Sequence, residues 1–176
     1  MLGAAGALLC LLAGTALGAG MKDRRQARYK LLQAETEAVG GMRLLLQQEK
    51  PGLPQLLRQS ADYAVTGYGA DQVVRRLLYA ADRLEREPSA GMERVYALAC
   101  EAIPAPFERE GEKAAMEMLF SQLGSGTAAM REEAASACLR RLKPLQENAL
   151  SEVGKGGKLC VQLGMLLGAM AGILLW

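Results

Sequence analysis

The sequence contains no histidine, and this absence removes several kinds of chemistry at once. Without imidazole there is no Ser-His or Cys-His nucleophile pair and no imidazole metal ligand, and the commonest general base is missing. The Gly-Ser-Gly segment at 124–126 also lacks the lysine and the length of a phosphate-binding loop. We therefore expect a protein that is not an enzyme and that uses no metal, no cofactor and no small-molecule substrate.

Cysteine pairs are missing as well. The four cysteines stand at positions 10, 100, 138 and 160, with neither the close spacing of a metal site nor the pattern of a disulfide framework. Such usage fits a reducing compartment. We interpret Cys100 and Cys138 as small core residues of the middle segment.

A strong excess of charge of either sign is also lacking. The formal net charge is +2, so bulk electrostatics provide no argument for binding nucleic acid. The one basic cluster begins at residue 22, directly after an apolar segment. At that position it would touch the anionic head groups of a lipid bilayer.

Charged side chains are absent from residues 1–21 and 159–176, and both segments are almost wholly apolar. Because an apolar helix of 17 to 25 residues can cross a bilayer, we predict membrane-spanning helices at 1–21 and 158–176 and one domain at 22–157. A cleaved signal peptide is the main rival, since Ala16, Leu17 and Gly18 resemble a cleavage site. It is disfavoured because no Lys or Arg precedes the apolar run.

Basic residues flank both predicted spans on the side of the middle domain. Because cytoplasmic flanks carry the excess of Lys and Arg, the middle is predicted to be cytoplasmic, with both termini on the opposite side of the membrane. The residues that set this topology are Lys22, Arg24, Arg25, Arg28, Lys30, Lys155 and Lys158.

No convincing period-two strand pattern occurs, and apolar residues in the middle recur at helical spacing. Breaks at 51–52, 66–69, 88, 104–106 and 124–126 divide it into about six helices, with Asp71, Ser89 and Thr127 as candidate caps. The predicted fold is all-α: a cytoplasmic bundle of about six helices flanked by an N-terminal and a C-terminal transmembrane helix. Predicted inner faces include Leu31, Ala34, Ala38, Met42 and Leu45; Val74, Leu77, Leu78, Ala81 and Leu84; Phe107, Ala114, Met118 and Leu119; and Met130, Ala134, Cys138, Leu142, Leu145 and Ala149.

Glycines recur at four-residue steps in both predicted spans, which would let another helix approach closely. We predict that the spans pack on each other or on a second copy of the chain. The alternative is that glycine is simply common in membrane helices. The residues are Gly14, Gly18, Gly164, Gly168 and Gly172.

Acidic residues crowd one predicted helix, at Glu108, Glu110, Glu112 and Glu117. An acid-base pair is disfavoured because these residues neighbour Arg109 and Lys113, as on a solvated helix face. We interpret the four as solvated surface and as candidate contacts for a basic partner.

An ordered set of segments resembles a known family. It comprises the first apolar span, the basic helix after it, the turn and helix start at 52–57 (GLPQLL), the segment 120–124 (FSQLG), and the terminal segment 158–168 (KLCVQLGMLLG). The order and the length of the chain resemble the stage III sporulation protein AB family of endospore-forming bacteria. The chain departs from the family at 125–127, where an acidic residue usually follows, and at Cys160, where an aromatic residue often stands.

This resemblance implies a specific role. Family members lie in the mother-cell membrane around the forespore, in an assembly with the other stage III A proteins, and their cytoplasmic domain is similar to the F domain of type II secretion platforms. The resemblance thus implies a membrane platform that binds a secretion-type ATPase and other stage III A subunits. A small membrane-anchored subunit of an unrelated transport or signalling complex is the alternative.

Overall fold

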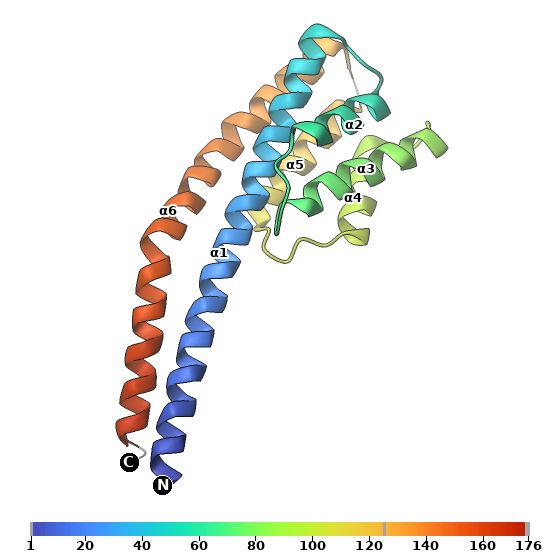
Figure 1. Cartoon of the computed structure of the whole chain (residues 1–176). Coiled ribbons are helices and arrows are strands. Elements are labelled where there is room, and N and C mark those ends of the chain that lie inside the picture. Colours follow the sequence, from blue (N-terminus) through green and yellow to red (C-terminus); the bar gives the residue numbers. More distant parts are fainter. Residues whose placement is uncertain (1, 125, 175–176) are drawn as a thin grey trace. The chain divides into compact units, whose positions relative to one another are not determined.

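The computed structural model describes residues 2–124 and 126–174, with side chains described for 20–124, 126–154, 166 and 170. In this part of the chain the structure has six helices and no strand, so the all-α prediction is confirmed (Figure 1). The helices are α1 (Leu2–Gln48), α2 (Leu53–Tyr63), α3 (Asp71–Arg86), α4 (Met92–Ala102), α5 (Glu110–Leu123) and α6 (Ala128–Leu174).

The chain divides into two compact units. One contains Met1–Gln26 with Asn148–Trp176, and the other is Ala27–Glu147. The long helices α1 and α6 contribute to both units, and α2 to α5 lie in the second. Inside this second unit, α2 packs on α3, α3 on α4 and α4 on α5. The predicted domain at 22–157 is close to it, but its exact bounds stay a prediction.

The core of the second unit begins with one face of α1. Leu31, Ala34, Ala38, Met42 and Leu45 are all buried, as their three- and four-residue spacing predicts. The helices α2 to α5 each bury apolar residues of their own. Between α4 and α5, the rings of Tyr96 and Phe120 stack with centroids 3.8 Å apart and an interplanar angle of 15°. Stacked aromatic rings in a buried position add directional packing to the area that they bury.

A glycine turn positions the loop between α2 and α3 against α1. Gly69 has φ +91°, and a Cβ built there would lie 2.3 Å from the carbonyl oxygen of Ala27. Only glycine tolerates both this backbone conformation and this approach. The next loop, between α4 and α5, meets it through Tyr68 and Phe107, whose ring centroids are 5.8 Å apart. The two loops therefore pack on each other.

Several predicted details are wrong in this structure. The N-caps of α3 and α4 are Ala70 and Gly91, not Asp71 and Ser89. The Asp71 carboxylate instead accepts a hydrogen bond from the Gly67 N–H at 2.7 Å and so closes the preceding turn. Thr127 does accept the Met130 N–H, at 3.4 Å, which confirms that cap.

The predicted inner face is confirmed in most of α6 and displaced in α5. Ala134, Cys138, Leu142 and Ala149 are buried, whereas Met130 is 61% exposed. The inner face of α5 is instead Glu112, Ala115, Met116, Leu119, Phe120 and Leu123, so Ala114 and Met118 were assigned wrongly. In α3, Leu78 is exposed and Val73 takes the buried position predicted for Val74.

Candidate functional site

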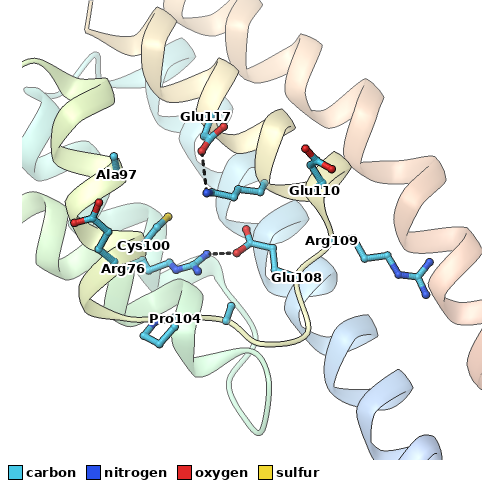
Figure 2. A pocket seen from close by; sticks show the side chains of 11 residues that line it. Arg76, Ala97, Cys100, Pro104, Glu108, Arg109, Glu110 and Glu117 are labelled. Carbon is cyan, nitrogen blue, oxygen red and sulfur yellow. Dashed lines mark hydrogen bonds and ion pairs between the residues drawn. The ribbon is translucent and has the colours of Figure 1, made fainter.

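An open pocket of about 380 Å³ lies where α3, α4, the loop after α4 and α5 come together (Figure 2). Most of its lining residues are charged, and charges of both signs are present. They are Arg76, Ala97, Cys100, Glu101, Pro104, Ala105, Glu108, Arg109, Glu110, Lys113 and Glu117. A pocket lined this way is suited to polar recognition rather than to holding an apolar ligand.

A buried ion pair forms the floor of this pocket. Arg76 Nη1 donates to Glu108 Oε2 at 2.9 Å, and only 4% and 6% of the two side-chain surfaces are exposed. The Nε of Arg76 donates to the carbonyl oxygen of Ile103, also at 2.9 Å. Arg76 thus ties α3 to the loop that precedes α5. Because it is held by two acceptors, its guanidinium is a fixed part of the pocket floor.

Cys100 is the thiol in this pocket, and its environment does not activate it. Burial raises the pKa of the thiol. Reactive cysteines need a lowered pKa, since the thiolate is the attacking species. The Cys100 thiol therefore lacks the lowered pKa of a reactive cysteine.

Behind the pocket, a carboxyl group is buried without a partner. Glu35 on α1 is 1% exposed, and neither of its oxygens has a hydrogen-bond partner. It borders a void too narrow for a water molecule, together with Arg76 and Tyr96. Burial, followed by the negative charge of Glu108, raises the pKa of Glu35 well above its ordinary value.

The groups that interact electrostatically with Glu35 come from α3, α4, α5, α6 and the loop before α5. Burial also raises the pKa of Tyr96 well above its ordinary value, and burial raises that of Cys138 on α6 to about 12. The nearby charges are Arg76 on α3, Glu108 on the loop and Glu112 on α5. Since a neutral acid is far cheaper to bury than a carboxylate, this environment favours the protonated form of Glu35.

A second buried ion pair joins α1 to α5. Arg28 Nε and Nη2 approach Glu112 Oε1 at 2.7 and 2.6 Å, with side-chain exposures of 7% and 1%. The other carboxylate oxygen of Glu112 accepts the N–H of Arg109 at 2.9 Å, which satisfies a free donor at the start of α5. Glu112 therefore anchors the first turn of α5 on α1.

These two pairs correct the interpretation of the acidic helix. Glu108 and Glu112 are buried and paired inside the protein, so the prediction of a solvated face is wrong for both. Glu112 does not reach the surface to meet a partner. Glu110 and Glu117 are exposed, and Glu117 lies 3.5 Å from Lys113 Nζ. For these two, contact with a basic partner stays a prediction.

The basic flank also needs a correction at one residue. Lys22 and Arg24 are exposed, Lys30 is half-buried, and Arg25 lies 3.5 Å from the carbonyl oxygen of Glu152. Arg28 is 6% exposed and engaged with Glu112, so its side chain does not face lipid head groups. The Arg28 guanidinium is therefore buried in the core of the bundle.

The predicted membrane segments fall mostly outside the described side chains. In the part of the chain with described side chains, no helix has a stretch long and apolar enough to cross a membrane. The spans at 1–21 and 158–176 lie almost entirely outside that part. Also outside it are Gly14, Gly18, Lys155, Lys158, Gly164, Gly168 and Gly172. The helical packing and orientation predicted for them stay predictions.

Sequence reasoning missed Glu35 and Arg76, although the signal was present. Glu35 falls between Leu31 and Ala38 on the buried face of α1, at four- and three-residue steps. Arg76 lies beside Leu77 on the buried face of α3. A charged residue in register with an apolar stripe is a candidate for burial with a partner.

In the part of the chain that the structure describes, the protein is all-helical, and charged side chains of both signs line its open pocket. Comparison with known families assigns it further: residues 3–176 match the model for stage III sporulation protein AB. The chain therefore belongs to the stage III sporulation protein AB family and is a subunit of the stage III A sporulation complex. No curated protein and no solved structure matches the chain.

Proposed function

We propose that the chain is a non-enzymatic membrane platform subunit of the stage III A complex. In this proposal its helical middle, residues 22–157, faces the mother-cell cytoplasm and binds a secretion-type ATPase, as an F-domain-like platform. Its spans, 1–21 and 158–176, lie in the mother-cell membrane around the forespore and bind other stage III A subunits.

The observation that carries the proposal is the extent of the family match, which covers residues 3–176 and so includes both predicted spans and the helical middle. The absence of histidine and the raised pKa of Cys100 support a binding role over a catalytic one. The family match disfavours the alternative of an unrelated transport or signalling complex.

The ATPase contact is tested by co-purification. The full chain, tagged and extracted from membranes in mild detergent, is expected to retain the secretion-type ATPase of the stage III A group of the same organism. A charge reversal of the exposed pair Glu110 and Glu117 to Lys should reduce the retained ATPase, whereas reversal of the exposed Glu93 on α4 serves as the matched control. Absence of ATPase with the unaltered chain would remove the main support for the platform role.

Membrane topology is tested by reporter fusions. The loop between α2 and α3 is a suitable insertion point, since Gly67 has open space around its Cα and the neighbouring Tyr68 is 71% exposed. A reporter inserted there should be active only on the cytoplasmic side, and one after Trp176 only on the opposite side. An exported reporter at Gly67 would contradict the proposed orientation.

Packing of the spans is tested at the glycines. Gly168→Leu should block close approach of a second helix and lower cross-linking to other subunits or to a second copy. A leucine at Met170, which is 61% exposed, is the control. Equal cross-linking in both variants would mean that the glycines do not mediate helix packing and are present only because glycine is common in membrane helices.

A further inference from the structure

We propose that the pocket between α4 and α5 binds the guanidinium group of an arginine side chain from a partner protein. This inference rests on the proposed function, because it assigns a contact chemistry to the partner-binding bundle. Four glutamates line the pocket, at 101, 108, 110 and 117, against the cations Arg76, Arg109 and Lys113. Figure 2 shows the Arg109 guanidinium pointing away from Glu108 and Glu110, so carboxylates predominate inside the pocket.

The ion pairs already present leave acceptors unused. Arg76 pairs with Glu108 at 2.9 Å and Lys113 with Glu117 at 3.5 Å. Among the residues that the structure describes, neither Glu101 nor Glu110 has an ion-pair partner. These two carboxylates come from opposite walls of the pocket, Glu101 from α4 and Glu110 from the start of α5. A cation placed between the walls would be attracted by both.

An independent observation lies at the floor of the pocket. Only 6% of the Glu108 side-chain surface is exposed. Its Oε1 atom is buried and has no hydrogen-bond partner in the described structure. Only Oε2 is engaged by Arg76. Figure 2 shows this carboxylate in the space between α4 and α5. Because a buried acceptor without a donor is costly, the floor favours a ligand that brings N–H groups to it.

The chemistry of the lining selects arginine. A guanidinium has five N–H donors in a planar fork, so it can serve the floor carboxylate and a wall carboxylate together. It is also more weakly hydrated than an ammonium group, which lowers the cost of entering the pocket. No group of residues in the described part of the chain has the makeup of a metal site, so a metal ion is not the expected occupant.

The test uses the full chain in detergent, labelled with ¹³C at alanine methyl groups. The probe is N-acetyl-L-arginine amide. We expect saturable shifts of the Ala97 and Ala105 methyl signals, which line the pocket, and none at the exposed Ala129 on α6. The lysine analogue should bind more weakly, and added salt should weaken both.

Matched variants locate the site. Glu101→Gln should weaken arginine binding about two- to fivefold, whereas Glu93→Gln, exposed on the same helix but outside the pocket, should leave it unchanged. Lys113→Gln removes a competing cation with half of its side chain exposed, so binding should tighten by a similar factor. A gain in affinity cannot come from loss of folding.

Three outcomes would overturn the inference: no shift at Ala97 and Ala105, equal effects of Glu101→Gln and Glu93→Gln, or the same shifts with Mg²⁺ in place of the arginine probe. The platform proposal fails separately. If the ATPase co-purifies but arginine does not bind, the platform remains and the pocket assignment falls. If arginine binds but no ATPase co-purifies, the pocket serves another arginine-bearing partner and the platform proposal falls.

Discussion

Arg28 directs two of its nitrogens, Nε at 2.7 Å and Nη2 at 2.6 Å, to the same carboxylate oxygen of Glu112, which lies 84 positions later in the chain. Both side chains are buried. The pair joins α1 to the first turn of α5, and Glu112 also accepts the Arg109 N–H that begins this turn. One carboxylate thus fixes both the start of α5 and its position on α1.

Loss of one member of this pair should be strongly destabilising. We expect Glu112→Gln to lower the free energy of unfolding by about 3 kcal/mol, since it removes the carboxylate charge that Arg28 approaches at 2.6 Å inside the protein. The double variant Arg28→Met, Glu112→Met should recover most of this loss, because neither charge of this pair is then buried. Urea unfolding of the detergent-solubilised chain, followed by circular dichroism, measures both. Purely additive losses in the double variant would contradict the coupling.

Stability should depend on pH through Glu35. Its pKa is raised in the folded protein above the ordinary 4.5. The folded state therefore keeps a proton that the unfolded chain releases, so this contribution is fully present below pH 4.5 and is lost as pH rises toward the folded pKa. Glu35→Gln imitates the protonated acid. Its advantage over the native chain should grow by up to about 1.4 kcal/mol per pH unit in this window.

The measurement is a series of thermal unfolding midpoints at fixed ionic strength from acid to alkaline pH. Glu132→Gln is the control, since Glu132 accepts an exposed hydrogen bond from Gln47 and is not near the Glu35 void. A pH-independent difference between Glu35→Gln and the native chain would show that Glu35 is ionised in the folded state.

Two adjacent glycines of α1 should respond in opposite ways to alanine. A Cβ at Gly40 meets nothing within 4 Å, whereas one at Gly41 would lie 2.5 Å from Cγ of Tyr63. Gly40→Ala should stabilise by about 0.5–1 kcal/mol, because alanine is the better helix former. Gly41→Ala should destabilise by about 1–3 kcal/mol, since the α2 ring must move. Unfolding midpoints of the two variants test whether α2 packs on α1 at this point.

The two thiols of the bundle should resist alkylation to different degrees. Cys138 has a pKa of about 12, raised mainly by burial, and its Sγ lies 3.5 Å from the Ala115 carbonyl oxygen. Its reaction with iodoacetamide at pH 8 should be about a thousandfold slower than that of an unshifted thiol. Cys100 is half-buried and should react faster than Cys138.

Peptide mass spectrometry over a time course measures each rate, and the urea-unfolded chain is the control in which both thiols should react alike. Equal rates in the folded chain would mean that α6 leaves α5 often enough to expose Cys138.

Helix number and most helix ends follow from local rules that the sequence displays. Pro51 and Pro104 lie at helix breaks and Gly124 follows the end of α5, although Pro144 lies inside α6. The apolar stripe of α1 places its buried face correctly. The inner face of α5 was displaced because a charged residue, Glu112, occupies it. A reading that reserves inner faces for apolar residues cannot include Glu112 without knowing that Arg28 lies opposite.

The sequence by itself determined an all-helical protein with uncharged ends and no histidine-based chemistry, since helix periodicity and side-chain inventory are local properties. Only the tertiary structure decided which charges are surface and which are core. Five buried ionisable side chains influence one another's charge and pairing, although up to 84 positions of the sequence separate them. They are Arg28, Glu35, Arg76, Glu108 and Glu112. Burial raises the energy of an unpaired charge so steeply that its neighbours, and not its own type, decide its role.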